Sequence, residues 1–374
     1  MRPAPLPVAF GVFGLLWGAW QAVLPDLARH YELSSGPLGA ILTAGFAVSL
    51  PAMLLTGRLM DRLGARWGIG LPAVAMAVGL ALVGVLPPLP ILVLAVILFA
   101  AGSGAFDVGI NGAAMGDGTW SRPARLTLLH AAFSGGGVAG ALGGGALIGA
   151  GLRFDAAYPV LAACLVATAV LVVTSRWSMP APTGAVPRTV AMAMLPLAAL
   201  AGLAFLAEGS METWSAIYLR DVLGAGAFVG ALGPAAFHAA MLVGRLIGAA
   251  VAGSLGTSAT LLVAGTMTML GMSVALLVPI PGAAIPGMAI GALGASFVVP
   301  VVVSVAAGRA GPHAGRAASY VLTLGYAGFL VGPSLVGILG ELAGLRVALA
   351  VVPIAGAVVA LASRRRHLIG QTAP

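Results

Sequence analysis

The chain has 374 residues, of which 60% are hydrophobic, and its charged side chains are 18 arginines and 10 aspartates or glutamates, with no lysine. A chain this apolar cannot keep a water-facing surface covered, which excludes an ordinary soluble domain and predicts that most of the protein lies in lipid. The arginines give a net charge of +8, but they are dispersed among apolar segments, which excludes a basic nucleic-acid-binding domain.

A helix needs about 20 apolar residues to cross the hydrocarbon core, so runs without charge predict the membrane spans. In the first half these runs are residues 8–25, 36–57, 67–106, 126–152 and 156–175. The run 67–106 is long enough for two helices, and the prolines of 87–90 divide it. A signal peptide is an alternative interpretation of the first run, but no small-residue cleavage site follows it, so we take it as the first span.

The second half repeats this plan. Its first span is residues 189–219, which contains Glu208 and Glu212, and its charge-free runs are residues 222–244, 246–308, 317–340 and 347–363. The long run should break at 253–258 and at 279–281 to give the end of the eighth span, the ninth and the tenth. We therefore predict an all-α membrane protein with twelve transmembrane helices in two six-helix bundles, residues 1–176 and 189–363, joined by a proline-rich linker at 177–188 and followed by a tail at 364–374.

Two internal matches indicate a duplication. The tripeptide Gly57-Arg58-Leu59 recurs as Gly244-Arg245-Leu246, 187 residues later, and Arg125 at the start of the fifth span is matched by Arg316 at the start of the eleventh, 191 residues later. Nearly equal offsets at equivalent places are expected of an internal duplication.

Arginine counts predict the orientation. On the twelve-span arrangement, fourteen arginines fall on the side of the two termini, and four fall on the opposite side: Arg29, Arg153, Arg220 and Arg346. The positive-inside rule therefore places both termini in the cytoplasm. The single cysteine, Cys164, excludes an intramolecular disulfide.

The segment 57–66 carries four charges between two apolar runs and predicts a sharp cytoplasmic turn. Its pattern is similar to the motif Gly-x-Leu-x-Asp-Arg-x-Gly-Arg-Arg/Lys-x-x-Ile between spans 2 and 3 of the major facilitator superfamily. The matching residues are Gly57, Leu59, Asp61, Arg62, Gly64, Arg66 and Ile69, and Ala65 stands where the first of two paired basic residues is expected.

The chain resembles this superfamily over its whole length. The resemblance implies a secondary active transporter in which two halves rock around a cavity lined by spans 1, 4, 7 and 10. It also implies that the motif acts as a conformational latch, in which Asp61 accepts hydrogen bonds from the N-terminus of span 11 near Arg316. The latch residues are Gly57, Asp61, Arg62, Gly64 and Arg66.

Within the superfamily, the chain resembles the MosC/YbjJ-like branch of bacterial inner-membrane proteins through residues 107–111, 130–136, 207–221 and 323–329. Rhizopine, an inositol-derived amine, is associated with this branch, so the resemblance implies a small polar solute that is sugar-, inositol- or amine-like. The antiporter pattern Gly-x-x-x-Gly-Pro-x-x-Gly-Gly is absent from span 5. The direction of transport therefore stays open, with efflux of a drug or metabolite as the alternative to import.

Charges at bilayer depth cost roughly 2.5–3.5 kcal/mol on insertion scales, so each charge there indicates either a functional site or a structural partner. Asp107 lies deep in span 4 with Asn111 one turn later, and His130 lies in span 5. One interpretation is a proton or solute site that faces the cavity. The alternative is a structural pair between Asp107 and an arginine such as Arg125, with a packed histidine beside it.

Glu208 and Glu212 in span 7 share one helix face. Two adjacent carboxylates repel when both are ionised, which favours one bound proton and suits a proton carrier. The alternative for Glu212 is hydration near the outer interface. His238 stands alone in span 8, and it is either a site residue or a packed core histidine.

Trp17, Trp20 and Gln21 lie on the outer half of span 1. Aromatic rings beside an amide suit a sugar-like solute, and interfacial anchoring explains the rings as well. The letters Gly135-x-Gly137-x-x-Gly140 match a dinucleotide-binding pattern, but no strand precedes them, so we expect no nucleotide site.

The sequence therefore predicts a transporter that is not an enzyme and that uses no cofactor or metal. We expect it to move a small polar solute across the bacterial inner membrane as a monomer, coupled to protons, with lipid around it and no nucleic-acid partner. An ion-independent facilitator is the alternative within transport. A non-transporting membrane sensor is more remote, because the linker and the tail are too short to hold an output domain.

Overall fold

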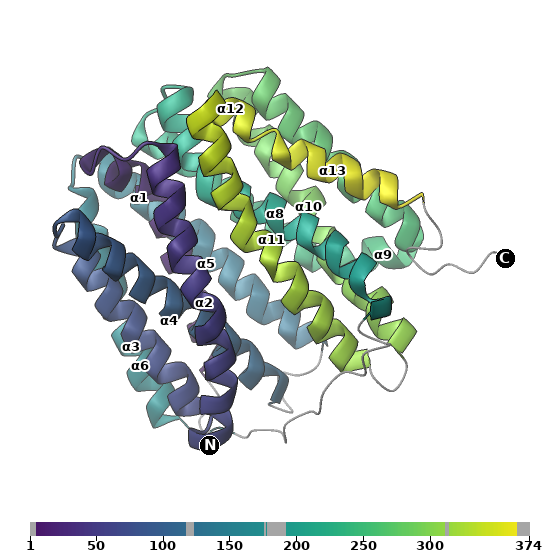
Figure 1. The fold of residues 1–374 in the computed structure, drawn as a ribbon, viewed down its shortest axis with the longest axis horizontal. Helices are drawn as coiled ribbons and strands as arrows, with labels where there is room; N and C mark the ends of the chain where they lie inside the picture. Colours follow the sequence, from purple (N-terminus) through teal and green to yellow (C-terminus); the bar gives the residue numbers. More distant parts are fainter. Residues whose placement is uncertain (1–4, 117–122, 176, 178–191, 311–313, 365–374) are drawn as a thin grey trace. The chain divides into compact units, whose positions relative to one another are not determined.

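The computed structural model describes residues 5–116, 123–175, 177, 192–310 and 314–364, and in these ranges the regular structure is helical, without a strand (Figure 1). Twelve helices in this part of the chain are long and apolar enough to cross a membrane. The predicted all-α architecture with twelve transmembrane helices is confirmed. The chain divides into two compact units, Met1–Pro182 with Gly226–Ala231, and Thr183–Ala225 with Leu232–Pro374.

The first unit is a bundle in which α1 packs along α5, α2 and α3 pack on α4, and α3 also packs on α6 (Figure 1). Its helices are α1 (Leu6–His30), α2 (Ser35–Leu63), α3 (Ala65–Gly84), α4 (Leu89–Gly116), α5 (Pro123–Gly149), the short 3-10 helix η1 (Phe154–Ala156) and α6 (Ala157–Thr174).

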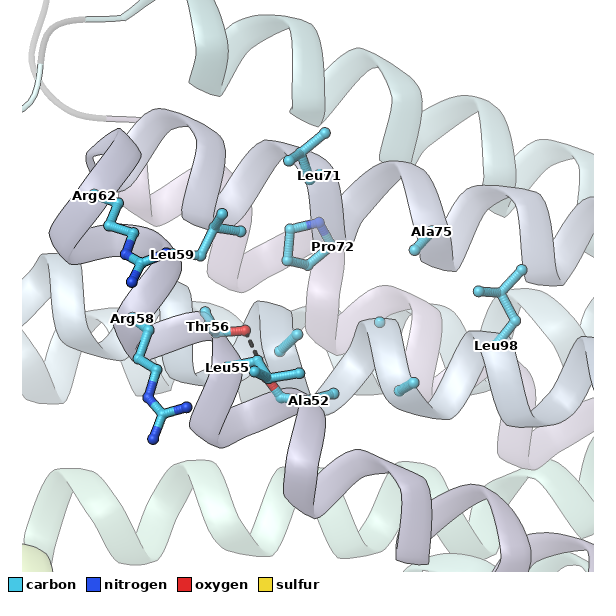
Figure 2. A pocket seen from close by; sticks show the side chains of 13 residues that line it. Ala52, Leu55, Thr56, Arg58, Leu59, Arg62, Leu71, Pro72, Ala75 and Leu98 are labelled. Atoms are coloured by element: carbon cyan, nitrogen blue, oxygen red, sulfur yellow. Dashed lines mark hydrogen bonds between the residues drawn. The ribbon is translucent and has the colours of Figure 1, made fainter.

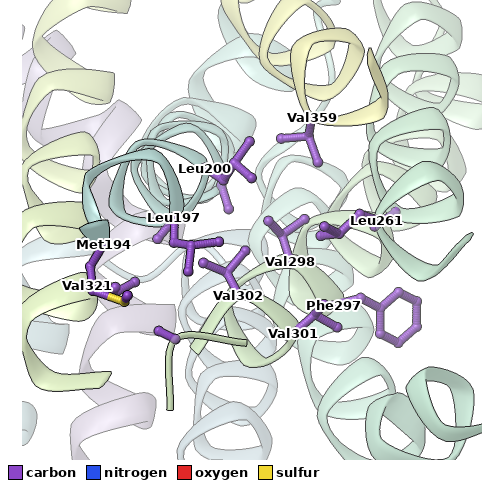
Figure 3. Packing of buried hydrophobic residues seen from close by; sticks show 14 of the residues in the cluster. Met194, Leu197, Leu200, Leu261, Phe297, Val298, Val301, Val302, Val321 and Val359 are labelled. Atoms are coloured by element: carbon purple, nitrogen blue, oxygen red, sulfur yellow. The ribbon is translucent and has the colours of Figure 1, made fainter. Parts of the chain in front are cut away.

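The second unit repeats this plan around α8, which packs against α10, α11 and α13. Its helices are α8 (Leu195–Ile217), the π-helical turn η2 (Tyr218–Val222), α9 (Ala227–Leu277), α10 (Pro281–Ala310), α11 (Ala314–Ala343), α12 (Leu345–Ala348) and α13 (Val351–Ala362). Figure 3 shows the core of this unit, where Leu197, Leu261, Val298 and Val359 bring together side chains from four helices.

The predicted breaks in the long apolar runs are confirmed. Pro87 and Pro88 lie between the end of α3 and the start of α4, and α10 begins at Pro281 after α9 has ended at Leu277. Inside α9, Gly256 has φ 75° and ψ 166°, a conformation that favours glycine, and it separates the eighth span from the ninth.

Several helices are longer than the charge-free runs that predicted them. The helix α2 continues past Gly57 to Leu63, so most of the charged segment is helical and the turn is confined to Gly64, at φ 82°. Similarly, α4 continues past Asp107 to Gly116. A charge ends an apolar run without ending a helix, because the backbone hydrogen bonds continue at any depth. The last predicted span corresponds to Leu345–Ala362, and within it a turn at Leu349 and Ala350 separates α12 from α13.

The same close helix contact occurs in both units. A Cβ added at Gly136 of α5 would overlap the carbonyl oxygen of Gly11 in α1, and one added at Gly328 of α11 would overlap that of Gly202 in α8. Small residues let helix backbones approach in this way in membranes. One turn later the contact recurs in both units: Gly140 lies against the carbonyl oxygen of Leu15, and Gly332 lies against that of Leu206.

The turns repeat as well. Gly64 and Gly256 have almost the same backbone angles (82°, 168° and 75°, 166°) and lie 192 residues apart. Gly151 and Gly344, 193 residues apart, also have positive φ, 80° and 84°. Each of these two glycines follows an alanine and precedes Leu-Arg, so the tetrapeptide Ala-Gly-Leu-Arg occurs at both places. This tetrapeptide repeat strengthens the inference of a duplication.

The two Gly-Arg-Leu segments do not lie at the same distance from the glycine turns that follow them. Arg58 lies six residues before Gly64, whereas Arg245 lies eleven residues before Gly256. The two arginines therefore differ in position by five residues relative to the repeat of the fold.

Candidate functional site

The second unit buries two carboxylates and a histidine that come from two helices. Glu208 and Glu212 of α8 are each 7% exposed, and His238 of α9 is 1% exposed. The Nε2 atom of His238 lies 3.7 Å from Oε1 of Glu212. His238 is alone in its span by sequence, and the structure places it beside Glu212.

A fourth charge belongs to this group. Arg245 is half-buried on α9 and lies within electrostatic range of Glu208 and His238. From the sequence, Arg245 was expected only to be part of the Gly-Arg-Leu repeat. Its seven-residue spacing from His238, two helical turns on one face, is the signal that could have identified it. We name Glu208, Glu212, His238 and Arg245 the charged cluster.

Hydrogen bonds from α8 and from η2, which continues it, join this segment to neighbouring helices. The indole Nε1 of Trp214 donates to the carbonyl oxygen of Pro333 in α11 at 3.1 Å. The hydroxyl of Tyr218 donates to the carbonyl oxygen of Ala275 in α9 at 3.0 Å. Both rings are fully buried, so they fix the C-terminal end of α8 and the start of η2 against α11 and α9.

The face of α8 next to Glu208 is flanked by aromatic rings. Tyr326 stacks on Phe329 with ring centroids 5.6 Å apart, and it also meets the ring of Phe205 at 5.8 Å. A Cβ added at Gly209 would lie 3.0 Å from the carbonyl oxygen of Phe329, so α11 packs directly against the residue after Glu208.

In the first unit, Asp107 and Asn111 of α4 are joined by hydrogen bonds. The Nδ2 atom of Asn111 donates to Oδ1 of Asp107 at 2.9 Å and to the carbonyl oxygen of Asp107 at 3.0 Å. Both side chains are half-buried. The ring of His130 on α5 meets the ring of Phe10 edge-on at 5.4 Å.

Aromatic rings connect these residues to α1. Phe13 contacts Phe106, next to Asp107, at 5.4 Å, and it contacts Phe133 on α5 at 5.5 Å. Trp17 packs on Phe99 at 5.8 Å. Gln21 lies one turn after Trp17 and is 1% exposed.

Trp20 lies inside the unit. It is 3% exposed and stacks on Phe99 with ring centroids 5.0 Å apart. Its burial favours packing in the core over the interfacial anchoring that was the alternative for these rings.

The motif residues 57–66 lie at the joint between α2 and α3. The N–H of Gly64 donates to the carbonyl oxygen of Met60 at 2.9 Å, and the carbonyl oxygen of Gly64 accepts from the N–H of Gly68 at 3.1 Å, so Gly64 both ends α2 and starts α3. Asp61, Arg62 and Arg66 are exposed within the first unit. Gly57 lies within α2 with no atom near the position of an added Cβ. The side chain of Arg316, near the expected partner of Asp61, lies outside the described residues, so the latch stays a prediction.

Over the described ranges, no group of three or more His, Cys, Asp or Glu side chains could hold a metal ion. The arrangement instead offers two polar regions, one in each unit, within helices long enough to cross a bilayer. Such a fold with intramembrane charges defines a multi-pass membrane transporter.

Comparison with known proteins gives the family. Residues 7–293 match the model of the Major Facilitator Superfamily, and the chain belongs to this family. It is 30% identical over 363 residues to an uncharacterized MFS-type transporter of Yersinia pestis, covering 96% of this chain and 94% of that one. It is also 30% identical over 380 residues to the membrane protein MosC of Rhizobium meliloti, covering 98% of this chain and 91% of MosC. The protein is therefore a transporter and not an enzyme.

Solved structures share the fold at low sequence identity. A bacterial homologue of the human lysosomal transporter Spinster, in an inward-facing and occupied conformation, has a TM-score of 0.79 at 15% identity, with 100% of both chains covered. The Escherichia coli fucose:proton symporter FucP has a TM-score of 0.63 at 17% identity, with 99% of both chains covered.

Proposed function

We propose that this transporter moves a small polar solute, sugar-, inositol- or amine-like, across the bacterial inner membrane by alternating access and couples this movement to protons. The observation that carries the proposal is the buried contact between Glu212 and His238, with Glu208 one turn away on α8. The active form is a monomer with both termini in the cytoplasm.

Charge balance explains why this cluster suits proton coupling. Arg245 carries a permanent positive charge and can balance one carboxylate in the cluster. The second carboxylate is balanced only when a proton is bound, either on itself or on His238. In a low-dielectric interior an unbalanced charge is costly, so the cluster favours one exchangeable proton.

The first unit supplies groups that can bind a polar solute. The Asp107 carboxylate is oriented by the Asn111 amide, and His130, Trp17 and Gln21 lie on the adjacent helices α5 and α1. Carboxylate and amide groups hydrogen-bond hydroxyls and amines, and aromatic rings pack on the apolar faces of such solutes. The name of FucP, a fucose:proton symporter of the same fold, is consistent with this combination of solute and ion.

The test is transport by the purified protein in proteoliposomes. A panel of radiolabelled inositols, sugars and small amines is offered with and without an imposed pH gradient. We expect at least one solute to accumulate only when the gradient is present. The orientation of the pH gradient that drives this accumulation gives the direction of transport. Equal uptake with and without the gradient would show an ion-independent facilitator instead.

A further inference from the structure

A cleft in the first unit opens between α2, α3 and α4, and no residue of the charged cluster lines it. Its volume is about 560 Å³, and its lining includes Leu55, Arg58 and Arg62 of α2. Leu71 and Ala75 of α3 and Leu98 of α4 complete the walls. Figure 2 shows both arginines at one end of the cleft and Leu98 at the opposite end.

The lining is apolar except at the arginine end. The hydroxyl of Thr56 donates to the carbonyl oxygen of Ala52 at 2.9 Å, so this bond already uses its proton. Arg58 and Arg62 are one turn apart on α2, and both are exposed. Within the described part of the chain, neither guanidinium has an ion pair or a hydrogen bond. The cleft therefore combines two unneutralised positive charges with a long apolar wall.

We propose that this cleft binds an anionic phospholipid, with the phosphate on Arg58 and Arg62 and an acyl chain along the apolar wall. Guanidinium groups bind phosphate oxygens through paired N–H donors, and two of them one turn apart can hold one headgroup. The volume lies in the range of small-molecule sites. A water-soluble anion would use only the arginine end and would leave the apolar end empty.

The surroundings of the cleft also favour a lipid. Leu55 and Leu71 of its lining are 59% and 46% exposed, as expected of side chains in contact with acyl chains. The arginines lie near the C-terminal end of α2, on the side that the positive-inside rule assigns to the cytoplasm. The cytoplasmic leaflet carries the anionic lipids that attract such basic residues.

The test is native mass spectrometry of the full-length protein in detergent with added phosphatidylglycerol or phosphatidylcholine. Wild type should retain phosphatidylglycerol in preference to phosphatidylcholine. The double variant Arg58→Gln/Arg62→Gln should bind phosphatidylglycerol about tenfold more weakly, because each arginine near an anionic headgroup contributes severalfold. Unchanged retention in this variant would overturn the proposal.

A matched control removes the same charge elsewhere. Arg66 and Arg364 are exposed and do not line the cleft. The variant Arg66→Gln/Arg364→Gln should therefore retain phosphatidylglycerol as wild type does. An equal loss in both double variants would mean that binding follows net charge alone, and the cleft site would be rejected.

A second variant tests the apolar wall and keeps both arginines. Ala75→Phe fills the cleft near Leu98, and it should reduce phosphatidylglycerol binding severalfold while the monomer peak on size exclusion stays unchanged. Full retention by this variant would show that the acyl chain lies elsewhere. Inorganic phosphate at the same concentration should not displace the lipid, and complete displacement would identify a site for free phosphate.

Discussion

His238 of α9 and Glu212 of α8 approach each other inside the second unit, with Nε2 3.7 Å from Oε1. This separation is too long for a strong hydrogen bond, yet it is short enough for an ion pair when the imidazole carries a proton. Protonation of His238 therefore strengthens the attraction between α8 and α9, and loss of the proton weakens it. A transporter can use such a change to link proton binding to helix movement.

Glu208→Gln tests the role of the first carboxylate in the cluster. The variant keeps the shape of the side chain but cannot release a proton, so it should lose accumulation driven by a pH gradient and retain counterflow of the solute identified in the panel. Glu341→Gln is the matched control, because Glu341 is an exposed carboxylate on α11 of the same unit. Full pH-driven accumulation by Glu208→Gln would show that this carboxylate does not carry the proton.

His238→Gln tests whether His238 and Glu212 act together. The single variant should transport with a pH profile flatter than that of wild type, because the imidazole no longer titrates beside Glu212. The double variant Glu212→Gln/His238→Gln should lose little more activity than the more impaired single variant, since residues that act as a unit are not additive. Losses that multiply in the double variant would indicate two independent roles.

The glycine contacts predict a contrast between neighbouring positions on α5. Gly136→Ala should destabilise the first unit by roughly 1–3 kcal/mol, because the new methyl group would overlap the backbone of α1 at Gly11. Gly135→Ala, one residue earlier, meets no atom within 4 Å and should be neutral or stabilise by up to about 1 kcal/mol through helix propensity. Thermal unfolding in detergent compares the two, and equal melting temperatures would contradict the close contact.

Orientation can be tested with single cysteines after Cys164 is replaced. Glu32→Cys, in the exposed turn between α1 and α2, should react with an impermeant thiol reagent added to intact cells. Gln371→Cys in the tail should react only after the cells are opened. Labelling of Gln371→Cys from outside would reverse the orientation given by the arginine counts.

Asp61→Asn tests the expected latch. A carboxylate at a helix N-terminus gains roughly 0.3–1 kcal/mol when exposed and up to about 2 when partly buried. If Asp61 makes this contact, the amide should favour inward-open states, raise thiol reactivity at cytoplasmic positions of the cavity and lower transport at unchanged expression. Reactivity and transport both equal to wild type would rule the latch out.

The fold was predictable because lipid restricts the structures that can span it. Prolines at 87–90 and 279–281 and the segment containing Gly256 divide the apolar runs where the helices do end. The helix ends near charges were not predictable from hydropathy, since α2 continues through the charged residues to Leu63. Backbone hydrogen bonding continues in water as well as in lipid, so a charge gives no signal that a helix stops.

The candidate site was predictable in part. Rare intramembrane charges identified Glu208, Glu212 and His238 individually, because each such charge is costly. Their grouping depends on how α8 and α9 pack, and sequence spacing reports faces only within one helix. The place of Arg245 in the group was therefore missed, although its spacing from His238 was visible in the sequence.

The two Gly-Arg-Leu segments differ by five residues in their position relative to the repeated turns, so their arginines face different sides of the two helices. Five residues turn a helix by about 140°, so the same tripeptide presents its arginine to a different side in each half. Arg58 lines an open cleft at the unit's surface, and Arg245 lies near the acids of α8. The same type of side chain therefore lines a surface cleft in the first half and lies near buried carboxylates in the second, so exchanging the two segments would not exchange the roles of their arginines.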